Sequence, residues 1–228
     1  MAARMGFRVG VVSNAYWATE VQDAVAWLRP LSRRIQDLSV SSDLYHSDEQ
    51  LSRQARHAGA AAAKLGIPSG TICVAQPEAT SAAPSVGQLP PGESAVMYRG
   101  RAAERLVARA AHEAWERFTE CPHEDMREPG RVHVDAFGNL HICQGIVVGN
   151  LLRTPLERIC REYAPDSHPI TGPLLEGGPA ELVRRYALAH EDAYADACHL
   201  CYECRRGLRT RFPEVLAPDQ MYGAPKGI

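Results

Sequence analysis

The sequence lacks an excess of basic charge and any long apolar run. Its 228 residues carry 25 Lys and Arg against 27 Asp and Glu, a net charge of -2, whereas nucleic-acid-binding proteins usually carry a basic excess. No stretch approaches the roughly 18 consecutive apolar residues of a membrane-spanning helix, and the first residues show no signal-peptide pattern. We therefore expect a cytoplasmic protein with no nucleic-acid partner and no membrane contact.

Cysteines are scarce in the first half of the chain and frequent in the second. No cysteine precedes Cys73, although the chain has seven. Because a reducing compartment disfavours disulfides, this odd number indicates metal or redox chemistry rather than a disulfide framework. No internal repeat is present.

Residues 1–118 alternate apolar strand patterns with helical ones. Short apolar runs at 7–12, 37–41, 71–74 and 95–98 predict strands, and apolar spacing predicts helices at 19–35, 47–65 and 101–118. Strands joined by helices form parallel sheets. We therefore expect an α/β domain over residues 1–118.

From residue 119 the pattern becomes irregular and rich in cysteine, proline and glycine. Gly138 and Asn139 lie between two short apolar runs, which predicts a β-hairpin with Cys143 on its returning strand. We expect residues 119–228 to form a second, small domain.

Two overlapping CxxC pairs at Cys198, Cys201 and Cys204 form the strongest local motif. Thiols three positions apart on one helical turn can bind the same centre. Cys121 and Cys143 could complete a set of four ligands, while the role of Cys204 stays open. The alternative is packing, because free cysteines behave as small hydrophobes, and we expect that role for Cys73 and Cys160.

The pattern Cys121, Gly138-x4-Cys143, a long gap and Cys198-x2-Cys201 resembles the auxiliary-cluster domain of radical SAM enzymes, known as SPASM or in its shorter form twitch. The resemblance implies one auxiliary [4Fe–4S] cluster, bound by those four cysteines, that anchors a substrate or accepts its electron. No cysteine follows Cys204, so a second cluster is not expected.

The first half resembles the same family at its strand ends. Asn14, Ser41 and Asp43 are similar to residues that face S-adenosyl-L-methionine (SAM) in a (β/α) barrel, and Arg101 could bind a carboxylate of SAM or of substrate. Turn and helix-cap roles are the alternative for the first three, and a solvated helix start is the alternative for Arg101. The resemblance implies a partial parallel barrel of about four βα units.

Two family motifs are absent from the sequence, the CxxxCxxC of the catalytic cluster and a Gly-Gly-Glu segment. We therefore expect the C-terminal portion of a radical SAM/SPASM-type oxidoreductase or peptide-modifying enzyme, inactive alone, with a peptide or protein substrate; a stand-alone descendant is the alternative. A strand at 7–12 without its neighbours should leave an exposed apolar edge.

Two other functions remain open for the cysteines. The same thiols could hold zinc in a non-catalytic binding or scaffold module, and a redox CxxC is a weaker possibility. We expect His123, His141 and His199 to lie near the ligands without binding metal. The basic run at 205–211 predicts a solvated helix face, and the tail at 213–228 an extended chain that crosses back over the centre.

Overall fold

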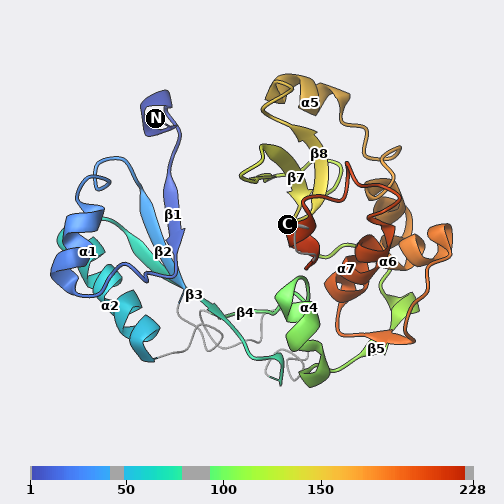
Figure 1. Cartoon of the computed structure of the whole chain (residues 1–228), viewed down its shortest axis with the longest axis horizontal. Helices are drawn as coiled ribbons and strands as arrows, with labels where there is room; N and C mark the ends of the chain where they lie inside the picture. The colour runs from blue at the N-terminus through green and yellow to red at the C-terminus, as the bar shows by residue number, and fades with distance from the viewer. Residues whose placement is uncertain (1, 42–48, 79–92, 224–228) are drawn as a thin grey trace. The chain divides into compact units, whose positions relative to one another are not determined.

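The computed structural model describes residues 2–41, 49–78 and 93–223. It divides into two compact units, Met1–Val96 and Met97–Ile228, called unit 1 and unit 2 below (Figure 1). The boundary lies earlier than residue 118, because the segment that follows Val96 packs with the cysteine-rich part of the chain.

Unit 1 contains the expected parallel sheet. Strands β1 (Gly10–Ser13), β2 (Asp37–Ser41) and β3 (Ser69–Val74) lie side by side, and the short β4 (Glu93–Ser94) pairs in parallel with the end of β3. The sheet is open over the described residues, with β1 at one edge and β4 at the other. The α/β class is thus confirmed, whereas the described strands do not close into a barrel.

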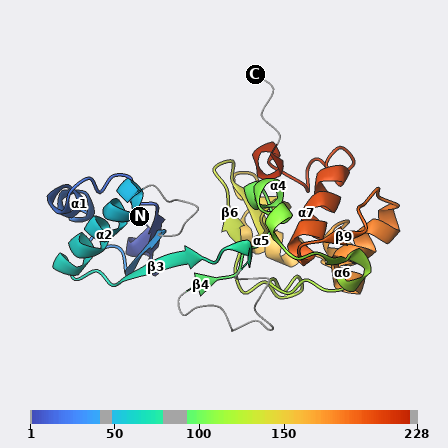
Figure 2. The ribbon, with the colours of Figure 1, turned by 90° about the horizontal axis from the view of Figure 1, so that it is seen from below.

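Helices α1 (Val21–Leu28) and α2 (Glu49–Lys64) cover one face of this sheet (Figures 1 and 2). Alternate side chains of β2, Leu38 and Val40, are buried beneath them. Ala58, Ala61 and Ala62 of α2 are fully buried. Because alanine side chains are small, the two helices and the sheet can approach closely around a shared core.

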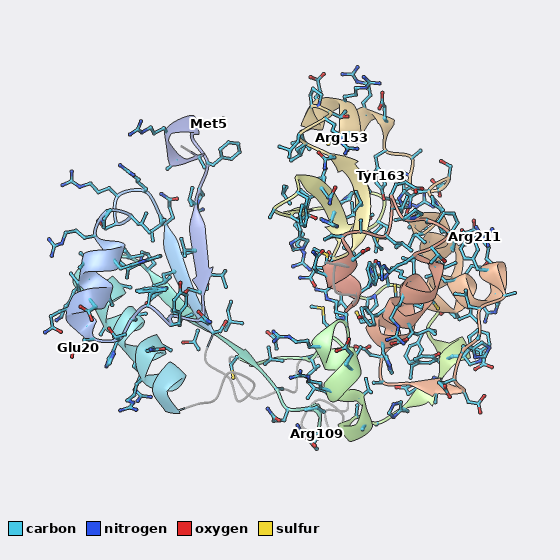
Figure 3. The ribbon with its side chains drawn as sticks, viewed as in Figure 1. Met5, Glu20, Arg109, Arg153, Tyr163 and Arg211 are labelled. Carbon is cyan, nitrogen blue, oxygen red and sulfur yellow. The ribbon has the colours of Figure 1, made fainter. Side chains whose placement is uncertain are left out.

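The N-terminal part of unit 1 leaves apolar side chains exposed, as predicted. Phe7 is 62% exposed and Val12, on edge strand β1, is 68% exposed. Met5 in the 3-10 turn η1 (Ala2–Met5) is also exposed (Figure 3). Val12 lies on the face opposite the buried Leu38 side, so α1 and α2 cover only one side of the sheet.

Unit 2 begins with a segment that does not form the helix expected at 101–118. Helix α4 ends after five residues (Arg101–Arg105), and η3 (Val107–Arg109), β5 (Glu113–Ala114) and η4 (Trp115–Arg117) follow. Strand β5 pairs with β9 (Ala193–Tyr194), far away in the sequence. This long-range pairing replaces the helix that local spacing favoured.

The rest of unit 2 joins a three-stranded antiparallel sheet to helices. The sheet contains β6 (His133–Val134), β7 (Asn139–Cys143) and β8 (Ile146–Asn150). Gly138 has a φ of +79°, which glycine adopts without strain, so the predicted hairpin at Gly138 and Asn139 is confirmed. The other elements are α5 (Leu156–Glu162), α6 (Thr171–Tyr186), α7 (Ala197–Leu208) and η5 (Asp219–Tyr222).

Among the helices of the described ranges, none has both the length and the apolar character needed to cross a membrane.

Candidate metal centre

The four cysteines that the sequence singled out line one cavity of unit 2. Its wall also contains Arg99, Arg205 and the apolar side chains of Met126 and Leu174; the four thiols belong to Cys121, Cys143, Cys198 and Cys201. They come from a loop, a strand end and a helix, which span more than 70 residues of sequence. Their convergence is the main structural observation on function.

A tight hairpin turn places Cys143. Strand β7 ends at Cys143, and Gln144 and Gly145 turn the chain into β8. Gly145 has a φ of +86°, and a Cβ atom there would lie 2.5 Å from the Tyr222 hydroxyl. The same hydroxyl donates a hydrogen bond to the Gly145 carbonyl at 2.7 Å. Glycine at this position therefore lets the turn and Tyr222 pack together behind Cys143.

The first turns of α7 place Cys198 and Cys201. Asp196 caps this helix, since its Oδ1 accepts a hydrogen bond from the His199 amide at 2.6 Å. Positions 198 and 201 are three residues apart, so both side chains lie on the face of α7 that borders the cavity. This placement is consistent with the prediction that two thiols three positions apart face the same centre.

A glycine in α6 places Cys121. The helix is interrupted at Gly177 and Gly178, directly before Pro179. A Cβ atom on Gly178 would lie 2.2 Å from the Glu120 amide nitrogen, and the Ala180 amide donates to the Phe118 carbonyl. The chain just before Cys121 thus rests directly on the interruption, which brings this thiol to the cavity.

The spacing of the thiols bears on which group they could hold. No three His, Cys, Asp or Glu side chains of the described residues are grouped closely enough for a single metal ion. Zinc–sulfur bonds are about 2.3 Å long, which puts the sulfurs of a tetrahedral site within about 4 Å of one another. The four thiols therefore line one cavity without forming a closed set of metal ligands among the described residues.

A buried arginine lies against the thiols. Arg205 is only 2% exposed, and it donates hydrogen bonds to the carbonyls of Cys201 and Gln144 and to the Tyr222 hydroxyl. None of these acceptors carries a full negative charge. Because an unbalanced buried cation is costly, the donor set calls for negative charge in the cavity, which metal-bound thiolates would supply.

The charge of Arg205 is maintained by its surroundings. Burial alone lowers the pKa of Arg205, but Tyr222 and the nearby thiols of Cys201, Cys143 and Cys198 raise it above its ordinary value. Arg99 adds a second cation, since its guanidinium donates to the Cys143 sulfur at 3.4 Å. Two guanidinium groups thus face a cavity of four thiols, a charge pattern that suits a dianionic thiolate centre.

Burial keeps the thiols of Cys198 and Cys201 protonated when no metal is bound. It raises the pKa of Cys201 to about 11 and, together with Asp196, also raises the pKa of Cys198. A redox CxxC needs a lowered thiol pKa instead. The redox alternative is therefore disfavoured, while metal binding would displace the protons.

The other three cysteines lie outside the cavity lining. Cys204 is buried in the core of unit 2, on α7. Cys73 is partly buried on β3. Cys160 is exposed on α5, so its predicted packing role is wrong: Ile159 is the buried residue of this short helix.

Two of the three histidines near the cysteines, His141 and His199, have hydrogen-bond partners in the protein. His141 is buried, and its Nε2 lies 3.1 Å from Asp135 Oδ2. The Nδ1 of His199 accepts a hydrogen bond from the Ala195 amide, and burial lowers the pKa of His199 to about 4. His123 is exposed. None of the three histidines is among the residues that line the cavity.

The predicted SAM-facing residues fall in different places. Asn14 and Ser41 lie at the carboxyl ends of neighbouring parallel strands, because Ser13 pairs with Val40. The Asn14 side chain accepts a hydrogen bond from the Tyr16 amide at 3.4 Å, a turn contact that matches the alternative role. Asp43 lies outside the described residues. Arg101 belongs to unit 2 and lines a pocket there.

Sequence reasoning missed Arg205 and Tyr222. Arg205 was placed on a solvated basic face, which is wrong for this residue because it is buried. Its position, four residues after Cys201, was the available signal: spacings of three and four place it on the cysteine face of α7. Tyr222 comes from the tail, which forms η5 beside Arg205 rather than only extended chain.

No family model matches the sequence. A search of curated proteins likewise gives no match.

Proposed function

We propose that unit 2 binds an iron–sulfur cluster through Cys121, Cys143, Cys198 and Cys201. The observation that carries the proposal is the convergence of these four thiols on one cavity. One further feature supports it: a buried guanidinium next to the thiols requires negative charge. When bound through four thiolates, such a cluster would supply a one-electron carrier, because no iron keeps an open coordination position.

The residues around the cavity have separable tasks in this proposal. Arg205 and Arg99 balance the thiolate charge, and hydrogen bonds and burial around the sulfurs would tune a redox potential. Met126 and Leu174 exclude water from one side. Gly178 and Gly145 let the backbone pack closely enough to place Cys121 and Cys143.

The wider proposal is that the chain is the C-terminal, auxiliary-cluster part of a radical SAM/SPASM-type enzyme that modifies a peptide or protein. It is supported by the cysteine pattern and by the parallel βα units of unit 1, whose sheet would form part of a barrel. Without a CxxxCxxC motif, the 228-residue chain should not cleave SAM. Formation of 5′-deoxyadenosine by the purified, reconstituted chain would contradict this part of the proposal.

The alternative function is a zinc-stabilised binding or scaffold module that uses the same thiols. Anaerobic reconstitution of the full chain with iron and sulfide, followed by absorption spectroscopy in the thiolate-to-iron charge-transfer region, separates the two. The proposal predicts cluster absorption that Cys201→Ser removes and Cys160→Ser retains, because Cys160 is exposed and away from the cavity. Tight zinc binding without any cluster absorption would favour the alternative.

A further inference from the structure

A second pocket of unit 2 lies beside the cysteine cavity and is rich in hydrogen-bond donors. It has a volume of about 280 Å³, near the lower end of ligand-binding pockets. Three arginines and two glutamines contribute side chains to its wall: Arg99, Arg101, Arg205, Gln144 and Gln220. No carboxylate is among its lining residues in the described part of the chain.

The pocket also contains a buried hydroxyl without a protein partner. Tyr202 is 1% exposed and lines the pocket, and its hydroxyl has no hydrogen-bond partner among the described residues. Leaving such a group unpaired costs about 1–3 kcal/mol. Its ring is held in place by stacking on Tyr222 at 5.9 Å. A bound ligand with an acceptor oxygen would satisfy this hydroxyl.

The charges around the pocket favour an anion. The guanidinium of Arg205 is rigidly held by the Gln144 carbonyl and the Tyr222 hydroxyl, and Arg101 adds a cation from the start of α4. Glu104 and Glu203 are carboxylates near Tyr202, but neither lines the pocket. The phenol O–H of Tyr202 can donate a hydrogen bond to an anion. Planar guanidinium groups bind carboxylates and phosphates through paired hydrogen bonds.

We propose that this pocket binds the carboxylate or phosphate group of a ligand through Arg101, Arg205 and the Tyr202 hydroxyl. Arg99 and Arg205 line both this pocket and the cysteine cavity. The ligand would therefore be anchored next to the thiols, with its uncharged remainder free to extend toward them. The anion site itself does not depend on which metal the thiols hold, so it can be tested on the metal-free chain.

The test compares two variants of equal charge change in the metal-free, full-length chain. Arg101→Gln removes a pocket cation, whereas Arg153→Gln removes an exposed arginine outside the pocket. Thermal unfolding is followed during titration with inorganic phosphate or with glutarate, against chloride at equal ionic strength. Arg101→Gln should weaken binding of the preferred anion by about tenfold or more, because it removes a charge-assisted hydrogen bond. The Arg153→Gln variant should bind this anion as tightly as the parent chain does.

A third variant tests the hydroxyl. Tyr202→Phe should weaken binding several-fold and leave the unfolding midpoint of the ligand-free chain unchanged or higher, because it removes an unpartnered buried group. Preference for phosphate or for glutarate identifies the ligand's anionic group, and either supports the proposal. Equal affinities in Arg101→Gln, Tyr202→Phe and Arg153→Gln, or no anion effect beyond that of chloride, would overturn it. Iron content, measured separately, reports on the cluster and not on this site.

Discussion

Unit 1 and unit 2 differ in the side chains that their helices and strands enclose. Unit 1 buries its apolar side chains on one face of a parallel sheet and leaves Val12 and Ile72 exposed. Unit 2 surrounds four thiols and a buried guanidinium with loops, a hairpin and two helices, α6 and α7. A regular sheet–helix pattern thus builds the first unit, whereas the second depends on a few residues placed one by one.

The largest expected difference between the two units is the change in their stability when bound metal is removed. If the thiols hold a metal centre, its removal should destabilise unit 2 strongly and leave unit 1 unaffected, since binding free energy becomes folding free energy only where the ligands lie. Chelation of the reconstituted chain should therefore lower protection from hydrogen exchange in α7 and β7 but not in α2. Equal loss of protection in both units would contradict the prediction that metal stabilises unit 2 alone.

The next effect tests whether the two cores are independent. Leu38→Ala in unit 1 and Leu200→Ala in unit 2 each remove a fully buried side chain from a different cluster. Each should cost about 2–5 kcal/mol in its own unit only. Hydrogen exchange of the α2 and α7 amides reads the two units separately. Loss of protection in α7 on Leu38→Ala would show that the units unfold together.

Gly178→Ala tests how backbone packing places Cys121. The new Cβ would meet the backbone of residues 118–120 at a position where φ is +63°. We expect a loss of about 2–4 kcal/mol in unit 2 by chemical denaturation, from strain and displaced backbone. Gly207→Ala is the control: nothing lies within 4 Å of its Cβ position, on α7, so helix propensity predicts a neutral or stabilising change.

A smaller, pH-dependent difference is expected from His168. Burial lowers the pKa of His168 below its ordinary value of 6.5, and its Nδ1 accepts hydrogen bonds from the Ile170 and Thr171 amides. The unfolded chain therefore binds the proton more tightly. Stability is full above pH 6.5 and falls as the pH drops below it, by about 1.4 kcal/mol for each unit of pKa difference.

The measurement for this prediction is the unfolding free energy of the metal-free chain between pH 7.5 and 4.5. His168→Gln should flatten the decrease, and His190→Gln, at an exposed position, should leave it unchanged. Identical pH profiles for both variants would show that His168 does not cause the loss of stability at low pH.

The sequence predicted those features that depend on local chemistry. Gly138 and Asn139 specify a turn, so the hairpin and the placement of Cys143 could be predicted. The CxxC spacing put Cys198 and Cys201 on one helix face. Features set by distant partners could not be predicted: β5 pairs with β9 some 80 residues away, which ends the helix expected at 101–118. The burial of Arg205 follows from its place on the cysteine face of α7, four residues after Cys201, which the prediction of a solvated basic face overlooks.

The central claim is that four thiols of unit 2 form one iron–sulfur centre, and counting iron and acid-labile sulfide tests it most directly. After anaerobic reconstitution and removal of excess reagents, the account predicts about four irons and about four sulfides per chain. Cys201→Ser should lose both, while Cys160→Ser keeps both. Stoichiometric zinc with no sulfide, or full iron retention in Cys201→Ser, would contradict the claim.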